Sequence, residues 1–231
     1  MSLALSRGER LFRWLLVLPA LALLLFVTGF PTSFAYYMSV HRITIETFWR
    51  PVFVGINNFV SVARNSEFWY SLWFTIMFMV VATSLEMLLG LGLAVLFQGR
   101  IRGKAVMLAL ILTPLGVAPA LYGLMFRLML DSVTGVIPAL FSLIGVRFSP
   151  MASYPTMVLS LIAIDVLQWT PFVFLILYAA LHSLPSEPLE AAVVDGASGW
   201  QVLRFVTLPL IKPAMVVAGL FRLMDAFKIF D

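Results

Sequence analysis

The polar side chains whose spacing best suits ligand binding lie within an apolar stretch of the sequence. Asp165, Gln168 and Trp169 are spaced i, i+3 and i+4, which places them on one face of a helix, and Pro171 interrupts the backbone hydrogen bonds shortly afterwards. A carboxylate, an amide and an aromatic ring on one face suit a ligand that carries several hydroxyl groups. The same groups could instead form hydrogen bonds between helices that only hold the protein together. Both interpretations stay open.

Six charged residues, Asp165 among them, lie within apolar segments, where a charge is costly unless it faces protein or water. They are Glu86, Arg127, Asp165, Arg222, Asp225 and Lys228. We add Asp225 to the ligand-path candidates, together with Tyr122, which lies one helical turn before Phe126. Glu86 lies beside Gly90 and is interpreted as a packing or hydrogen-bonding residue. The predicted ligand path therefore consists of Asp165, Gln168, Trp169, Tyr122 and Asp225.

Catalytic chemistry finds no support in the residue pattern. The sequence has no G-x-x-x-x-G-K-[ST] nucleotide-binding loop, no histidine next to a plausible nucleophile and no pair of carboxylates in one loop. It has no cysteine, and its two histidines, His41 and His182, are too few and too far apart for a metal cluster. We therefore predict no catalytic residue, no metal site and no enzyme activity in this chain by itself.

The composition places the chain in a lipid bilayer. Of its 231 residues, 62% are hydrophobic and 11% charged, and the mean hydropathy is +1.03; these values lie outside the range of soluble domains. The chain has room for several spanning helices of about 20 residues each, but not for a sizeable domain outside the membrane. The net charge of +4 is small and dispersed, so nucleic acid is not expected as a partner.

Five apolar segments predict membrane-spanning helices in a single all-α domain that covers residues 1–231. They are residues 14–38, 68–97, 106–130, 154–181 and 214–231. Pro114 and Pro119 predict a kink or unwound turn in the third helix, a feature that commonly lines a cavity. The first segment resembles a signal peptide, but it exceeds the usual apolar region of roughly 7–15 residues and lacks a clear cleavage site, so a retained helix is favoured. Because the chain stops inside an apolar segment, we expect it to be truncated, with about one further helix missing.

The arginine and lysine residues predict the orientation of these helices, because short basic loops favour the cytoplasm. Arg7, Arg10 and Arg13 precede the first helix, and residues 100–104 form a second basic turn. Residues 131–153 contain only one basic residue, whereas residues 41–67 contain three and are an ambiguous counterweight. We therefore predict a cytoplasmic N-terminus and a cytoplasmic loop at residues 182–213.

The predicted cytoplasmic loop reads as two short helices joined by a hinge. Pro188 suits the first turn of a helix, and Gly196 suits the left-handed conformation that often ends one. Ser198 and Gln201 have the spacing of a capping box that begins a second helix. Leu208-Pro209 is expected to end that helix. Taken alone, this pattern also fits a loop that merely spaces two membrane helices.

The residue pattern of this loop resembles the cytoplasmic EAA motif of permease subunits in bacterial and archaeal ABC importers. Glu190-Ala191-Ala192 is followed by Gly196 and then by Leu208-Pro209, and the wider run is similar to the carbohydrate, maltose-permease-like branch. Residues 53–59, 168–172 and 221–231 resemble further elements of that branch. We call residues 190–210 the EAA segment. In that family this segment is the coupling helix region, which docks on an ATPase subunit; the resemblance thus implies coupling roles for Glu190, Ala191, Ala192, Asp195, Gly196, Leu208 and Pro209.

The resemblance also implies the surroundings of the chain. We expect a multi-pass permease of the prokaryotic inner (cell) membrane that imports a sugar in a binding-protein-dependent transport system. The implied partners are a second permease subunit, two ATPase subunits that bind the ATP and Mg²⁺, and an extracytoplasmic solute-binding protein; no cofactor is expected in this subunit. Alternatives are a permease for glycerol-phosphate-like or other polar solutes, an ion-coupled secondary transporter that uses Asp165 and Glu86 as relay groups, and a non-transporting assembly subunit.

Overall fold

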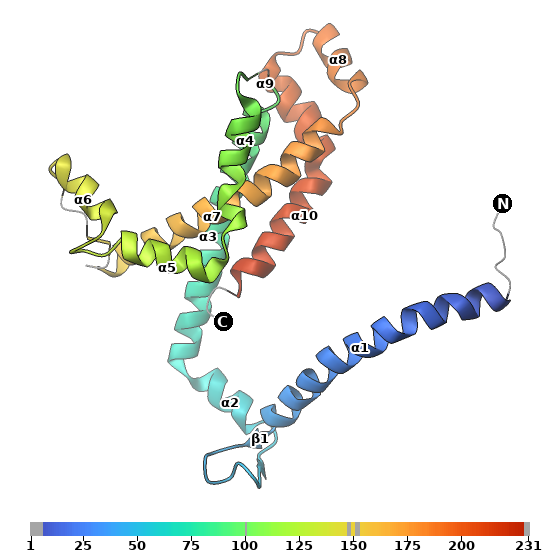
Figure 1. Ribbon diagram of the computed structural model, residues 1–231, viewed down its shortest axis with the longest axis vertical. Helices are drawn as coiled ribbons and strands as arrows, with labels where there is room; N and C mark the ends of the chain where they lie inside the picture. The colour runs from blue at the N-terminus through green and yellow to red at the C-terminus, as the bar shows by residue number, and fades with distance from the viewer. Residues whose placement is uncertain (1–6, 100, 147–148, 151–152, 229–231) are drawn as a thin grey trace. The chain divides into compact units, whose positions relative to one another are not determined.

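The computed structural model describes residues 7–99, 101–146, 149–150 and 153–228 and is predominantly helical (Figure 1). The chain divides into two compact units, Met1–Leu72 and Trp73–Asp231. Helix α3 (Ser66–Leu96) supplies its first residues to the first unit and the remainder to the second. The predicted all-α class is confirmed, with one ladder of two-residue strands added.

The first unit contains α1 (Arg7–Ser39), the antiparallel strands β1 (His41–Arg42) and β2 (Val52–Phe53), and α2 (Asn57–Arg64). The ring of His41 stacks on Tyr37 at 4.0 Å and meets Phe53 edge-on at 5.3 Å. The side-chain amide of Asn58 donates hydrogen bonds to the backbone carbonyls of Ser39 and His41. These contacts tie the end of α1 to the strands and to α2, a helix that the sequence analysis did not predict.

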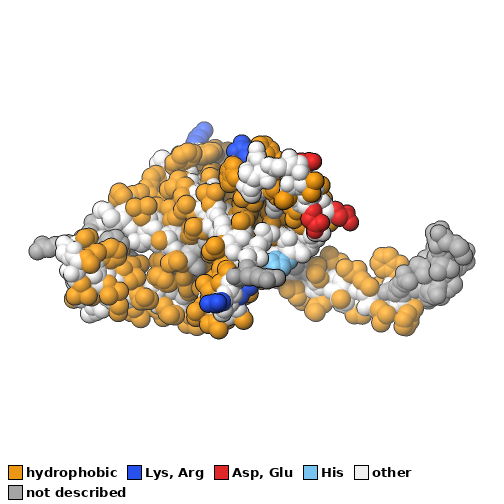
Figure 2. All heavy atoms as spheres, turned by 90° about the horizontal axis from the view of Figure 1, so that it is seen from above, with side chains coloured by type: hydrophobic (Ala, Val, Ile, Leu, Met, Phe, Trp, Pro, Cys, Tyr) orange, Lys and Arg blue, Asp and Glu red, His pale blue; other side chains and the backbone are white. Residues whose placement is uncertain are grey.

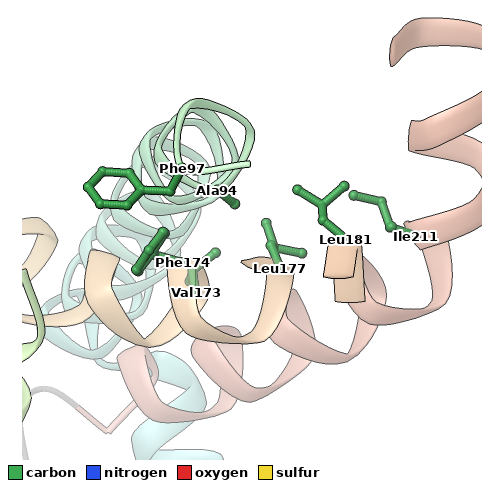
Figure 3. Packing of buried hydrophobic residues seen from close by; sticks show 7 residues of the cluster. All are labelled: Ala94, Phe97, Val173, Phe174, Leu177, Leu181 and Ile211. Carbon is green, nitrogen blue, oxygen red and sulfur yellow. The ribbon is translucent and has the colours of Figure 1, made fainter. Parts of the chain in front are cut away.

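The core of the second unit lies between α3, α7 (Tyr154–His182) and α10 (Leu208–Ala226). Figure 3 shows its largest buried cluster, which consists of Ala94, Phe97, Val173, Phe174, Leu177, Leu181 and Ile211. Gly90 allows α3 and α7 to approach closely, because a Cβ atom there would lie 3.0 Å from the backbone nitrogen of Phe174. A small residue at such a contact is typical of membrane helix pairs.

The third predicted span is broken at the prolines, as expected. Helix α4 (Lys104–Leu112) passes into the 3₁₀ turn η1 (Thr113–Gly116), and α5 (Pro119–Met129) then leaves at an angle of 98°. Val117 between them is extended, and Pro119 occupies the first turn of α5, where its missing N–H costs nothing. The following segment contains α6 (Val136–Leu143), which the sequence analysis had left within a loop.

The prediction that Leu208 and Pro209 end a helix is wrong. Helix α9 (Gly199–Val202) continues through the π-helical turn η2 (Leu203–Thr207) into α10, so residues 199–226 form one helix with Pro209 and Pro213 inside it. The backbone N–H of Leu208 bonds to the carbonyl of Leu203, five residues back. This wider turn accommodates Pro209, whose ring would otherwise meet the carbonyl of the preceding turn. The helix therefore begins well before the predicted residue 214.

Four helices in the described parts of the chain are long and apolar enough to span a membrane, and the bent pair α4–η1 and α5 makes up to five. The four are Trp14–Ser39, Ser66–Leu96, Tyr154–His182 and Gly199–Ala226. Hydrophobic side chains cover most of the surface that Figure 2 displays. Such a surface suits contact with lipid or with other membrane helices.

Candidate functional site

A buried arginine on α10 joins three helices of the second unit. Arg222 is 1% exposed and binds both carboxylate oxygens of Glu86 on α3, with Nε–Oε2 and Nη2–Oε1 distances of 2.5 and 2.7 Å. Glu86 itself is fully buried. A bidentate pair of this kind is strong and geometrically specific. The interpretation of Glu86 as a hydrogen-bonding residue between helices fits this position.

The same guanidinium holds two aspartates that the sequence analysis placed on the ligand path. Its Nη2 atom donates to Asp165 on α7 at 2.9 Å, and its Nη1 atom donates to Asp225, one turn further along α10, at 2.7 Å. The guanidinium carbon also lies 4.8 Å from the centre of the Trp169 ring, in cation–π geometry. Arg222 thus fixes the positions of an acid pair and an aromatic ring.

Asp165, Asp225 and Trp169 line a cavity of about 390 Å³, which we call the Trp169 cavity. Its lining includes all five predicted ligand-path residues: Tyr122, Asp165, Gln168, Trp169 and Asp225. The break between α4 and α5 helps to form it, because α5 supplies Pro119 and Tyr122 to the wall. Gln168 also donates a long hydrogen bond of 3.5 Å to the carbonyl of Val117, in the extended link of that break. This helix face therefore makes contacts between helices and also lines a cavity. Ligand contact by these residues stays a prediction.

Arg222 is a charged residue of this site that the sequence analysis did not assign to the ligand path. It had been noted among the charged residues in apolar segments, but nothing local indicated its partners. Glu86 and Asp165 lie 136 and 57 positions away in the sequence. The sequence did show an arginine deep in an apolar helix. Such a residue is expected to pair with carboxylates from other helices.

The EAA segment has the predicted local structure as far as Gln201, whereas its Leu208-Pro209 pair does not end the helix. Helix α8 (Glu187–Val194) carries Pro188 in its first turn and ends before Gly196, whose φ of +81° is left-handed. Ser198 and Gln201 form both hydrogen bonds of the capping box: the Ser198 N–H donates to Gln201 Oε1, and the Gln201 N–H donates to Ser198 Oγ. The two helices and the left-handed conformation of Gly196 are thus confirmed, although the second helix is longer than predicted. That Gly196 acts as a hinge stays a prediction.

Most of the predicted coupling residues are exposed to solvent. Glu190, Ala191, Asp195, Gly196 and Pro209 are exposed, whereas Ala192 and Leu208 are half-buried. Glu190 lines a groove of about 650 Å³ together with Val95 and Gln98, which lie at the end of α3 and just beyond it. The side chains of Val193 and Val194 are 62% and 86% exposed.

Of the second basic turn, residues 101–104 lie at the same end of the unit as the EAA segment (Figure 1). Gln98, just before that turn, lines the groove with Glu190. Lys104, the last residue of that turn, places its ammonium 5.1 Å from the centre of the Tyr178 ring, near the end of α7. This proximity agrees with a shared membrane face; that this face is cytoplasmic, with the N-terminus, stays a prediction.

The described residues contain no group of three or more histidine, aspartate or glutamate side chains that could hold a metal ion. The Trp169 cavity offers carboxylate and amide groups and an aromatic ring. Catalytic residues are not predicted in it.

Comparisons with known proteins show the family of this chain and its similarity to transport system permeases. A family model described as "Binding-protein-dependent transport system inner membrane component" matches residues 10–231. The chain is 35% identical over 221 residues to the trehalose/maltose transport system permease protein MalF of Thermococcus litoralis, covering 94% of this chain and 74% of the relative. It is also 35% identical over 225 residues to the trehalose transport system permease protein SugA of Mycobacterium tuberculosis, covering 97% and 72%.

A solved structure shares the fold. A chain in the crystal structure of a bacterial alginate ABC transporter, in complex with an alginate pentasaccharide-bound periplasmic protein, superposes with a TM-score of 0.78. It is 18% identical in sequence, and the match covers 96% of this chain and 74% of that one.

Proposed function

This chain belongs to the family of binding-protein-dependent transport system inner membrane components, and from that premise we propose that it is the permease subunit of an ATP-driven sugar importer. The sugar-transport names of the relatives MalF and SugA support the substrate class. The observation that carries the proposal is the Trp169 cavity, in which five residues predicted from sequence meet within the membrane-spanning unit.

The chemistry of the Trp169 cavity suits a ring that carries hydroxyl groups. Asp165 and Asp225 each bind Arg222 through Oδ2, but a carboxylate has about four lone-pair sites and can accept further hydrogen bonds from a ligand. The Asp225 side chain is 48% exposed, so a ligand can reach it. Trp169 offers an apolar ring face, and Gln168 offers an amide. Arg222 acts as a positioning residue, because it holds both carboxylates while being almost inaccessible itself.

The continuous helix of residues 199–226 provides a mechanical link between the EAA segment and the cavity. Its first turn contains the capping box, and the same helix carries Arg222 and Asp225. The 23-residue separation between Gly199 and Arg222 corresponds to about 35 Å at the rise of an α-helix. We infer that ATPase subunits pull on or release α8 and the EAA segment, and that this helix carries the displacement to the cavity. The Gly196 hinge and the π turn are the places where the helix pair can bend.

The proposal requires several partners outside this chain. A second permease subunit would complete the path, two ATPase subunits would bind ATP and Mg²⁺ at the EAA face, and an extracytoplasmic solute-binding protein would deliver the sugar. Val193 and Val194 would give the ATPase contact an apolar centre beside the acidic groups Glu187 and Glu190. The location is the inner membrane of a prokaryotic cell, with the EAA segment in the cytoplasm.

The test is uptake by the complete transporter in proteoliposomes, with the ATPase subunits inside and the loaded binding protein outside. We expect uptake of trehalose or maltose that requires ATP, and ATP hydrolysis that rises when the loaded binding protein is added. Sugar uptake driven by a proton gradient without nucleotide would establish the ion-coupled alternative. An assembled, ATP-hydrolysing complex that takes up glycerol phosphate and neither disaccharide would remove the sugar assignment.

A further inference from the structure

Two cavities of the second unit share part of their lining. The second, which we call the Arg127 cavity, has a volume of about 220 Å³ and is lined by Arg127 and Ser160 among others. Gly123, Leu161 and Ile164 line both this cavity and the Trp169 cavity. The two cavities therefore adjoin at one glycine from α5 and two branched apolar residues from α7.

Gly123 has no local structural reason to be a glycine. It lies in the interior of α5, where glycine costs about 1 kcal/mol relative to alanine. Its φ is not positive, in contrast to the φ of the described glycines at positions 55, 103, 145 and 196. A Cβ atom at this position would meet nothing within 4 Å, in contrast to Gly90, where α3 and α7 touch. Neither a turn nor a close helix contact within the described chain thus requires it.

What the missing side chain does provide is open space where the two cavities meet. We propose that Gly123 sets the width of the passage between the Arg127 cavity and the Trp169 cavity, and so limits the size of the saccharide that crosses it. This inference rests on the proposed function, since it assigns a size-determining residue to the same path. Because Gly123 lines both cavities, a larger side chain at this position would occupy space where they adjoin and narrow the junction. A Cβ atom there meets nothing within 4 Å, so the substitution does not clash with the described chain.

The test exploits the absence of cysteine from the chain. Gly123→Cys is introduced into the complete transporter, which is reconstituted and then treated with thiosulfonate reagents that attach a methyl, a propyl or a benzyl group. Because the protein is assembled before it is modified, the size of the attached group changes without any new demand on folding. Gly123→Leu provides a second, reagent-free measurement. We expect uptake to fall as the attached group grows, and the benzyl adduct to lower uptake about tenfold or more relative to the unmodified cysteine variant. Gly123→Leu should lower uptake by a similar factor relative to the wild type.

The matched control is Gly92→Cys, treated in the same way. Gly92 is also an exposed helix glycine whose Cβ would meet nothing within 4 Å, but it lines neither cavity. Its adducts should leave uptake unchanged. Equal effects of all three adducts at position 123, or wild-type uptake by Gly123→Leu, would overturn the inference.

Loss of complex assembly in Gly123→Leu, together with insensitivity of Gly123→Cys to adduct size, would also overturn it, since Gly123 would then be a packing contact with a partner subunit. These results are distinct from failure of the proposed function. If the proposed function were wrong, the unmodified wild-type complex would itself take up no sugar.

Discussion

Replacing Glu86 with glutamine should lower the free energy of unfolding by about 3 kcal/mol, the lower end of the cost of breaking a buried ion pair. Glu86 is fully buried and accepts two hydrogen bonds from Arg222, which is itself 1% exposed, so water cannot replace the lost charge. The lower end applies because Asp165 and Asp225 still neutralise the guanidinium.

Substitutions of Arg222 and Asp225 give losses in unfolding free energy with which the value for Glu86→Gln can be compared. Arg222→Met would leave three carboxylates around one site without their cation, so we expect a loss of about 5 kcal/mol, the upper end of the same range. Asp225→Asn should cost about 1 kcal/mol or less, because the Asp225 side chain is 48% exposed and its pair with Arg222 spans only one helical turn. The expected order of destabilisation is therefore Arg222→Met, then Glu86→Gln, then Asp225→Asn.

The assay is unfolding of the purified chain in mixed micelles by titration with sodium dodecyl sulfate, followed by helix content. Glu46→Gln is the matched control: it makes the same chemical change at an exposed position of the first unit and should shift stability by less than about 0.5 kcal/mol. If Glu86→Gln costs no more than Asp225→Asn, the argument that burial makes this pair stabilising would be refuted.

Three further predictions concern topology, the ligand path and coupling. A cysteine at Gln201 should react with an impermeant thiol reagent only after the cytoplasmic side is opened; labelling from outside intact cells would reverse the orientation. Trp169→Ala should lower sugar uptake more than it lowers recovery of the assembled complex, whereas loss of the complex with normal uptake kinetics in the remainder would assign Trp169 to packing. Gly196→Val costs about 1–2 kcal/mol at a left-handed position, and Glu190→Lys reverses a charge at the groove. Both should keep normal membrane levels but abolish binding-protein-stimulated ATP hydrolysis, and normal stimulation in both would make the segment a spacer.

Local sequence patterns predicted the structure correctly where it depends on interactions between residues close together in the sequence. Long apolar runs predict the spanning helices because each helix satisfies its own backbone groups in lipid. The capping box at Ser198 and the left-handed Gly196 were predictable for the same reason, since their hydrogen bonds join residues a few positions apart. The break around Pro114 and Pro119 also follows from the missing proline N–H groups.

The prediction that the helix ends at Pro209 was wrong, because the winding of the preceding turn decides whether the helix continues. A π turn takes up the strain and the helix continues. Sequence patterns predict that a proline disturbs a helix, but the choice between a stop and a wider turn is made by the balance of backbone geometry and packing. That choice determines whether the EAA segment and Arg222 share one helix.

By itself the sequence determined that the chain is a bundle of membrane helices, that it carries the EAA segment, and that Asp165, Gln168 and Trp169 share one face of an apolar helix. Only the tertiary structure decided that Glu86, Asp165 and Asp225 share one guanidinium, and that Gly123 lies where two cavities adjoin. The physical reason is the range of the interactions. Helix formation and capping are local, whereas charge pairing and cavity shape depend on how helices far apart in the sequence pack.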